Sequence, residues 1–291
     1  MQQLLESVLP TDGFITREVD IGARELLLKL FNKSVLKQQK WKELYAVLGD
    51  LEGKACLDLG SDNGVISYLL RSRGGTWCSG DLNGEVVESI ASVVGNAVFL
   101  TDGTRMPIED KSLDLVVVVD MLEHVREDTA LIQELSRIMK PGAKLIINVP
   151  NRFPRSILRA LRHMIGQTDE AHGHIRPGYN RQDLLAVLGT EFLLEETHTY
   201  SRFFAEVIDT LIVYAYSLMC SPKKGPRDPE ATDQDTSKGL VVTGEQLGKF
   251  EKKFRIYSMI YPFIRAVSAL DKALLFQEGF MRLAVARKSL S

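Results

Sequence analysis

Short apolar runs alternate with amphipathic stretches between residues 55 and 150. The runs at 55–59, 75–80, 97–100, 113–120 and 145–149 have the length and β-branched content of buried strands. Before the last run, apolar positions recur at helical spacing, which predicts a helix with Asp128 as its N-cap and Lys140-Pro141-Gly142 as its stop. This alternation predicts a doubly wound α/β sheet, in which ligands bind at the carboxyl ends of the strands.

The first strand runs directly into a glycine turn that contains carboxylates. Residues 55–64 read Ala-Cys-Leu-Asp-Leu-Gly-Ser-Asp-Asn-Gly, so that Asp58 lies in the strand and Asp62 lies between Gly60 and Gly64. A dinucleotide turn has three glycines, which let a pyrophosphate approach the helix N-terminus. A carboxylate at position 62 would repel a phosphate and attract the ammonium and sulfonium of S-adenosylmethionine. The turn therefore favours a cationic nucleoside and argues against a dehydrogenase.

Acidic residues also follow the second and third strands. Asp81 comes about 20 residues after the glycine turn, where a carboxylate can bind a ribose diol. Asp102, followed by Gly103, ends the third run, where an adenine amino group could donate to it. Each acid alone is compatible with an ordinary loop or turn. The prediction of a nucleoside pocket therefore depends on both acids following the glycine turn at the expected positions along the chain.

Taken together, these motifs resemble those of the class I S-adenosylmethionine-dependent methyltransferases, especially the small-molecule branch that includes the ubiquinone-pathway O-methyltransferases. The residues that carry the resemblance are 57–64, Asp81, Asp102-Gly103, Leu122-Glu123-His124-Val125 and Lys140-Pro141-Gly142. The resemblance implies a Rossmann-like seven-stranded doubly wound sheet, with further strands at 192–199 and 280–287. It also implies S-adenosylmethionine as the cofactor and a small-molecule acceptor, with oxygen favoured as the methylated atom.

The resemblance further implies a set of cofactor-binding residues. Gly60, Asp62 and Gly64 would line the methionine end, Asp81 the ribose, Asp102 with Gly103 the adenine, and Asp120 with Met121 the floor beneath the sulfonium; Asp58 and Leu82 complete the set. One departure concerns position 62, where the family often has a glycine. Asp62 could instead cap the following helix.

A methyltransferase has to align its acceptor and handle the acceptor's proton. His124 is the leading candidate base because it follows the fourth strand and an imidazole titrates near neutrality; Glu123 is its neighbour. The alternative is that this pair only braces a helix. Asp120, Glu123 and His124 lie at i, i+3 and i+4, so they could also converge on a divalent cation, as in the resembling enzymes. No metal is expected, because the same string occurs in relatives without one.

A second candidate catalytic histidine, His174, lies in the loop 171–180. In an extended loop His172 and His174 would face the same way, which allows a substrate contact or base, structural hydrogen bonding, or metal binding. After this loop Asn180 and Asp183 form a capping-box-like pair that predicts a helix beginning near Arg181.

The chain divides by pattern into four parts. We expect an N-terminal helical cap at 1–50, a methyltransferase core at 51–200, a helical insertion at 201–278 with a flexible loop at 221–243, and a closing strand at 279–291. The cap either covers the cofactor or packs on the sheet edge. The helices at 203–220 and 254–275 can form a lid, a dimer interface or a peripheral contact with a membrane surface. The apolar run 211–219 is too short to span a bilayer.

Composition limits the partners and the compartment. The 291 residues carry a formal net charge of −2 without a long basic block, so a nucleic-acid partner is not expected. Three cysteines without a paired motif favour a reducing compartment, and the first residues lack a secretory signal pattern. We therefore expect a cytoplasmic protein, with a membrane-peripheral enzyme or a non-catalytic cofactor-binding protein as alternatives. The oligomeric state stays open.

Overall fold

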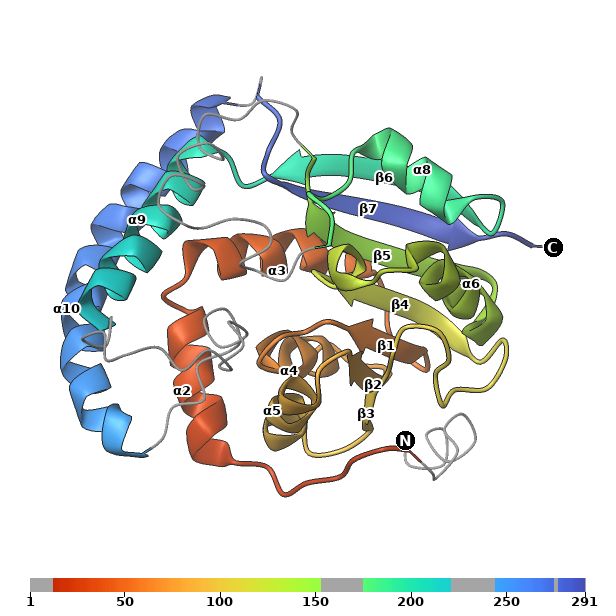
Figure 1. Ribbon diagram of the computed structural model, residues 1–291, viewed down its shortest axis with the longest axis horizontal. Coiled ribbons are helices and arrows are strands. Elements are labelled where there is room, and N and C mark those ends of the chain that lie inside the picture. The colour runs from red at the N-terminus through yellow and green to blue at the C-terminus, as the bar shows by residue number, and fades with distance from the viewer. Residues whose placement is uncertain (1–12, 153–174, 221–243, 275–276, 291) are drawn as a thin grey trace, which may run out of the picture.

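A seven-stranded sheet forms the centre of the computed structural model, which describes residues 13–152, 175–220, 244–274 and 277–290 (Figure 1). The strand order is β3-β2-β1-β4-β5-β7-β6, and β7 alone runs antiparallel to its neighbours. The strands are β1 Ala55–Leu59, β2 Thr76–Asp81, β3 Val98–Leu100, β4 Leu113–Val119, β5 Met139–Pro150, β6 Phe192–Tyr200 and β7 Met281–Lys288. The expected Rossmann-like fold is confirmed, and the last strand pairs between β5 and β6.

The central strands are continuous apolar runs because both faces of the sheet are covered. Leu57 and Val116 pack in one hydrophobic cluster, whereas their chain neighbours Cys56 and Val117 pack in the cluster on the other face. Helices α4 Val65–Arg71 and α5 Gly84–Val94 lie on one face, and α6 Asp128–Ile138 and α8 Arg181–Leu188 lie on the other. Cys56 and Cys78 are buried free thiols, as their strand positions predict.

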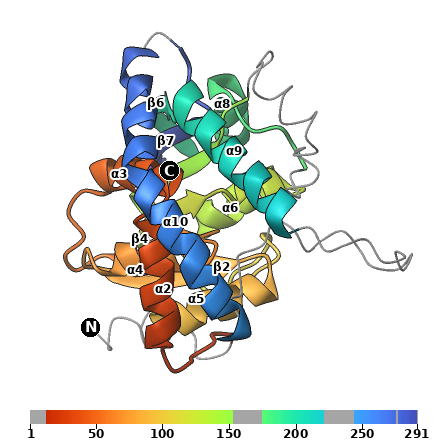
Figure 2. The ribbon, with the colours of Figure 1, turned by 90° about the vertical axis from the view of Figure 1, so that its left-hand side faces the viewer.

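Helices α2 Ile21–Phe31, α9 Phe203–Cys220 and α10 Gly244–Ser268 lie toward the carboxyl ends of the parallel strands, which we call the carboxyl edge of the sheet (Figures 1 and 2). The 3-10 helix η3 Ala269–Leu274 continues α10. Helix α3 Val35–Leu48 reaches the same edge, where Lys40 pairs with Asp120, and packs along a face of the sheet through Leu44 and Leu48. In the views of Figures 1 and 2, α10 is outermost and α3 lies nearest the strands. Helix α3 therefore packs on the sheet and also reaches, through Lys37 and Lys40, the edge where ligands of such sheets bind. No helix among the described residues is long and apolar enough to cross a membrane.

Two local predictions have different outcomes. The capping box of Asn180 and Asp183 is present at the start of α8. The prediction that Asp128 caps α6 is wrong, because Glu127 is the N-cap residue and Asp128 is the first residue of the helix. Its carboxylate instead pairs with the Arg176 guanidinium and accepts a hydrogen bond of 2.9 Å from the Tyr179 hydroxyl. The loop 221–243 and both His172 and His174 lie outside the described residues.

Candidate functional site

Asp58 holds the glycine turn together from inside the fold. Its side chain has no exposed surface, and its carboxylate accepts hydrogen bonds from the hydroxyls of Ser61, Ser67 and Ser79 at 2.5, 2.6 and 2.8 Å. The Arg71 guanidinium lies 3.4 Å away. A carboxylate surrounded in this way supports the turn from inside, and its burial gives no support to the prediction that Asp58 contacts the cofactor. Asp58 fixes the path of the turn that presents the neighbouring residues.

The two glycines of the turn are required by close packing. A Cβ atom on Gly60 would lie 2.2 Å from the carbonyl oxygen of Val119 and 2.7 Å from the Cβ of Met121. A Cβ atom on Gly64 would lie 2.9 Å from the Cα of Ile90 in α5. Gly60 therefore lets the end of β1 touch the end of β4, and Gly64 lets α4 pack on α5. Both also have positive φ angles.

Asp62 projects from the turn toward helix α3. It is a non-glycine residue with φ +52°, and its carboxylate lies 3.0 Å from the Lys37 ammonium. Gly64 is the N-cap of α4 and no side chain caps that helix, so the alternative role of Asp62 as a helix cap is wrong. The carboxylate stays half exposed at the carboxyl edge, with Lys37 as its partner.

The ends of β2 and β3 lie beside the glycine turn. Asp81 is half-buried and accepts a hydrogen bond of 2.9 Å from the backbone N–H of Asn83. The side chains of Leu82 and Val125 approach within 3.8 and 3.5 Å of the position that a Cβ on Gly103 would occupy. Asp102 is exposed, and hydrogen bonds from the backbone and hydroxyl of Thr104 lower the pKa of its carboxyl. An apolar patch with acids at its border thus lies where the nucleoside is expected.

Asp120, at the end of β4, is the centre of a polar network. It adopts φ +46°, its carboxylate pairs with the Lys40 ammonium from α3, and the Asn148 side-chain amide donates to it at 2.6 Å. The Tyr200 hydroxyl in turn donates to the Asn148 side chain at 2.5 Å. Although burial alone would lower it, the Asp120 carboxylate raises the pKa of Lys40. Sequence reasoning missed Lys40, Asn148 and Tyr200.

Glu123 is a buried carboxyl without a hydrogen-bond partner. Its side chain is 0% exposed, and neither of its oxygens is hydrogen-bonded. Burial raises the pKa of Glu123 well above its ordinary value, and the nearby Asp120 charge raises it further. Met121 is buried against Gly60, while His124 is half-buried at the end of the 3-10 helix η1 Leu122–His124. The buried Glu123 carboxyl therefore stands beside the Asp120 network.

The described residues contain no group of three or more His, Cys, Asp or Glu side chains arranged to hold a metal ion. The alternative in which Asp120, Glu123 and His124 converge on a cation is thus not supported by their arrangement. The segment after η1 is instead fastened by Arg176, which donates to the carbonyls of Val125 and Arg126 at 3.0 and 2.9 Å.

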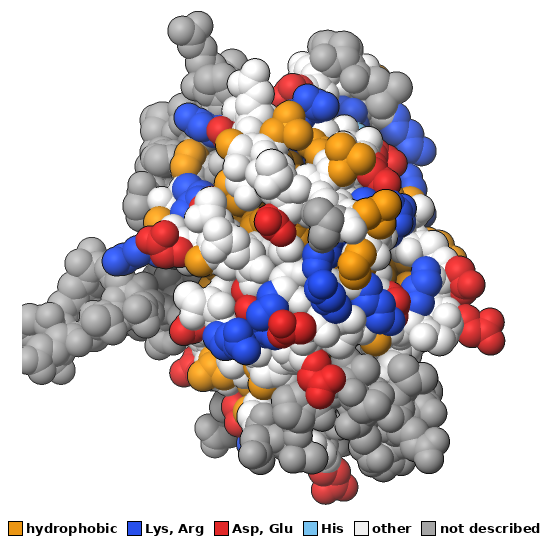
Figure 3. Space-filling view, turned by 90° about the vertical axis from the view of Figure 1, so that its right-hand side faces the viewer, with side chains coloured by type: hydrophobic (Ala, Val, Ile, Leu, Met, Phe, Trp, Pro, Cys, Tyr) orange, Lys and Arg blue, Asp and Glu red, His pale blue; other side chains and the backbone are white. Residues whose placement is uncertain are grey.

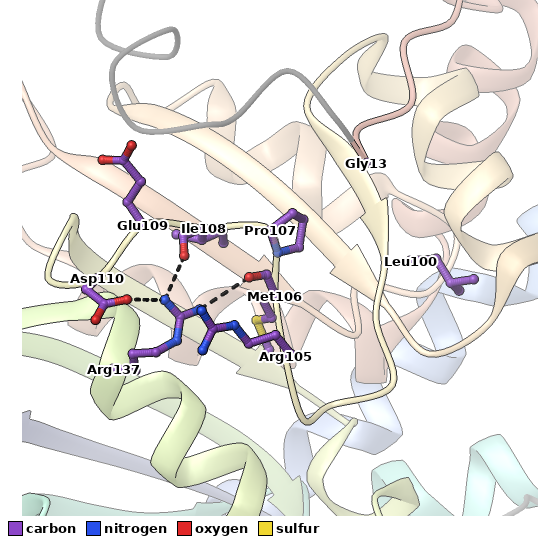
Figure 4. A pocket seen from close by; sticks show the side chains of 9 residues that line it. All are labelled: Gly13, Leu100, Arg105, Met106, Pro107, Ile108, Glu109, Asp110 and Arg137. Carbon is purple, nitrogen blue, oxygen red and sulfur yellow. Dashed lines mark hydrogen bonds and ion pairs between the residues drawn. The ribbon is translucent and has the colours of Figure 1, made fainter.

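A hollow of about 710 Å³ lies between the loop 105–110 and α6, with Leu100 at the end of β3 also in its lining (Figure 4). We call its charged part the Arg137 corner. The Arg137 guanidinium pairs with Asp110 and Glu134 and donates to the carbonyls of Met106 and Ile108. The Arg137, Asp110 and Glu134 charges are matched by one another, so this cluster is explained by structural packing.

Comparison with known proteins agrees with the geometry of the carboxyl edge. The family model described as a methyltransferase domain matches residues 57–147, which contain the glycine turn, Asp81, Asp102 and the end of β4. The chain contains a class I S-adenosylmethionine-dependent methyltransferase domain. The cofactor of this methyltransferase domain is S-adenosylmethionine.

Relatives of the methyltransferase domain include the ubiquinone biosynthesis O-methyltransferase of Hahella chejuensis, which is 35% identical over 118 residues. The match covers 38% of this chain and 49% of the relative, so the chain spans about half the length of the curated relatives it matches. Among solved structures, a candidate methyltransferase of Bacillus halodurans has a TM-score of 0.52 at 15% identity, covering 86% of this chain and 99% of that chain. At this identity the likeness shows the fold alone.

The phosphoethanolamine N-methyltransferase 2 of Haemonchus contortus, solved with phosphomonomethylethanolamine and S-adenosylhomocysteine, has a TM-score of 0.53 at 15% identity. It covers 87% of this chain and 52% of that chain. Relatives and neighbours of the methyltransferase domain thus include enzymes named for oxygen and for nitrogen acceptors. The comparisons leave the acceptor of this chain open.

The residues of the methyltransferase domain fit S-adenosylmethionine by their chemistry. Asp81 ends β2, and Asp62 and Asp120 follow β1 and β4. Their carboxylates are acceptors suited to a cation and to the hydroxyls of a ribose. The same set would repel the two phosphates of a dinucleotide. Asp62 and Asp120 already pair with Lys37 and Lys40, so a cationic ligand competes there with two ammonium groups from α3.

Proposed function

We propose that the chain transfers the methyl group of S-adenosylmethionine to an oxygen of a small, hydroxyl-bearing molecule. The observation that carries the proposal is the joint position of Asp120, Glu123 and His124 directly after β4, next to the glycine turn. Oxygen is preferred because the curated relatives of the domain are O-methyltransferases by name. The neighbours named for nitrogen acceptors resemble this chain in fold alone.

In this proposal the turn and the neighbouring strand ends hold the cofactor. Gly60, Asp62 and Gly64 shape the methionine end and Asp81 accepts from the ribose hydroxyls. Leu82 and Gly103 contact the adenine ring, and Asp102 stands at its border. Asp120 and the buried Met121 form the floor beneath the sulfonium. When bound, the cofactor supplies an activated methyl group.

The acceptor side of the proposed site needs a route for one proton. His124 is half-buried and is the proposed base that takes the proton from the acceptor hydroxyl. Burial and the nearby Asp120 charge raise the pKa of Glu123, which favours its neutral form; in that form Glu123 can offer a hydrogen bond to the acceptor or to the imidazole. His174 stays a proposed acceptor contact that lies outside the described residues. No metal is part of this proposal.

The proposal is tested by incubating the full chain with S-adenosylmethionine and a panel of phenols, catechols, carboxylates and amines, and by mass spectrometry of the products. A methyl ether, formed together with S-adenosylhomocysteine, is the expected product. His124→Gln should lower the rate by about a hundredfold, the usual contribution of a positioned base. His198→Gln is the matched control, because that half-exposed imidazole pairs with Glu43 of α3, away from η1. Methylation of amines only would contradict the choice of oxygen.

A further inference from the structure

The outward face of α10 and η3 exposes large apolar side chains. Met259, Ile260, Phe263 and Leu270 are 77%, 49%, 70% and 51% exposed. Met259, Phe263 and Leu270 follow one another at intervals of four and seven residues, so they lie along one face of the helical segment. We call these four residues the α10 stripe. A grouped apolar surface of this kind marks a contact with a partner or a membrane.

The α10 stripe has a basic border. Arg255, Arg265 and Lys272 are exposed on the same segment. Asp271 is the only acidic residue between 254 and 274, and it is buried, where it accepts hydrogen bonds from the backbone N–H groups of Phe204 and Ala205 at 2.7 and 3.2 Å. The exposed charge along this part of the helix is therefore entirely positive.

This charge decides between two occupants of the stripe. A two-fold copy of the chain would bring two identical stripes together and place like charges opposite each other. An anionic lipid surface offers an apolar layer for the side chains and negative head groups for the basic border. We propose that the α10 stripe binds an anionic lipid surface, with α10 lying in the plane of the interface. No described helix is long and apolar enough to enter the membrane as a span.

The inner face of the same helix reaches the corner between α2 and α3. The Tyr257 hydroxyl donates to the Lys33 carbonyl at 2.6 Å, and the Gln38 side chain donates to the Tyr261 hydroxyl at 2.7 Å. The Lys33 ammonium lies 4.9 Å from the centre of the Tyr261 ring. Helix α3 also places Lys40 on Asp120, so α10 contacts a helix that reaches the carboxyl edge. A lipid surface bound by the α10 stripe would therefore lie on the side of the molecule toward which the carboxyl edge faces (Figure 2). Lipid binding by the α10 stripe is a property separate from the proposed methyl transfer, and it can be measured without any enzymatic turnover.

The test is flotation of the full chain with vesicles of phosphatidylcholine, with and without phosphatidylglycerol. The chain should float with the anionic vesicles, and the Met259→Ser, Phe263→Ser double variant should lower the partition coefficient about tenfold or more. The matched control is Leu193→Ser with Leu290→Ser, two leucines that are 67% and 84% exposed away from α10. All four substituted side chains are exposed, so folding should be retained, and circular dichroism checks this.

The basic border is tested separately. Arg255→Gln with Arg265→Gln should weaken binding and its dependence on salt, whereas Arg105→Gln with Lys111→Gln, also exposed, should change neither. Three results would overturn the proposal: no flotation with either vesicle, equal flotation with and without phosphatidylglycerol, or undiminished flotation of the stripe variant. A dimer in sedimentation velocity that the stripe variant abolishes would assign the stripe to a second copy instead.

Discussion

The carboxyl edge and the Arg137 corner each bury a glutamate, and they treat it in opposite ways. At the corner, Glu134 is 5% exposed and accepts hydrogen bonds from the Arg137 guanidinium and the Met106 backbone N–H, both at 2.6 Å. Arg137 is held further by Asp110 (Figure 4). At the carboxyl edge, Glu123 is 0% exposed and neither carboxyl oxygen has a partner.

The difference separates structural charges from functional ones. A buried polar group without a partner costs free energy, so native structures contain few of them, and each requires an explanation. Paired charges also occur at the amino ends of the parallel strands, where Lys and Arg side chains are interspersed with Asp and Glu (Figure 3). There Arg287 pairs with Glu195, and Lys140 pairs with Asp114. At the carboxyl edge, Lys37 and Lys40 occupy carboxylates that a cationic ligand would need, and the Glu123 carboxyl has no hydrogen-bond partner. Such an arrangement is expected where a bound ligand supplies the missing partners.

The largest expected effect is a difference in stability between variants of the two buried glutamates, Glu134 and Glu123. Glu134→Leu should lower the free energy of unfolding by about 3 kcal/mol, because it leaves the buried Met106 N–H without a partner and the Arg137 charge with only the exposed Asp110. Glu123→Leu should leave stability unchanged or raise it by about 1 kcal/mol, because it removes an unpaired buried carboxyl. Chemical denaturation of both variants measures this. Equal destabilisation would show that Glu123 has a partner in solution.

The second prediction concerns the charge at the end of β4. Asp120→Asn should weaken S-adenosylmethionine binding by roughly tenfold to a hundredfold, because the amide no longer attracts a cation. Asp114→Asn is the matched control, since Asp114 pairs with Lys140 at the opposite end of the same strand. Calorimetric titration compares the two variants, and similar losses in both would locate the binding elsewhere.

The third prediction sharpens the role of α3. Lys40→Met should tighten binding of the cationic cofactor by about 1 kcal/mol, roughly fivefold, because it frees the Asp120 carboxylate from a competing ammonium. Lys42→Met, at an exposed position of the same helix, should leave the affinity unchanged. Weaker binding in Lys40→Met would mean that the lysine helps to form the site.

The smallest effect is a pH dependence of the contact between α3 and β6. The hydrogen bond to Glu43 raises the pKa of His198, and the same bond lowers the pKa of Glu43. The His198 contribution is present below its unfolded pKa and is lost as pH rises through its folded pKa. The Glu43 contribution is present above its unfolded pKa and is lost as pH falls through its folded pKa.

The pair therefore stabilises the fold most between the two unfolded values, around pH 5 to 6. His198→Asn should cost about 0.5 kcal/mol in that window and nothing at high pH, since the pair is partly exposed. Denaturant unfolding across pH measures the difference. A constant difference at all pH values would assign the contact to packing.

Much of the fold could be predicted from the sequence because its causes are local. The apolar runs of β1, β2, β4 and β5, the glycine turn and the Asn180–Asp183 capping box all arise within a few residues. The role of Asp128 was missed because its partners Arg176 and Tyr179 lie about 50 positions later in the chain. Local patterns cannot show which distant group a carboxylate will meet.

The site was predictable in outline and not in its contacts. The strand ends identify Asp81, Asp102 and Asp120, because parallel strands end at one edge. The interior position of Asp58 follows from three serines that surround it after folding. Lys40 and Tyr200 reach the Asp120 network from helix α3 and strand β6, at sequence separations of 80 from Asp120 and 52 from Asn148. The packing of α3 brings Lys40 there, and the pairing of β6 with β7 beside β5 brings Tyr200.

The central claim is that the carboxyl edge binds S-adenosylmethionine through its carboxylates. Calorimetric titration of the full chain with S-adenosylmethionine, with NADH as the control ligand, tests it most directly. We predict micromolar binding, about −8 kcal/mol, that Asp81→Ala weakens at least tenfold and Asp114→Ala leaves intact. Absence of binding, or equal affinity in wild type and Asp81→Ala, would contradict the claim.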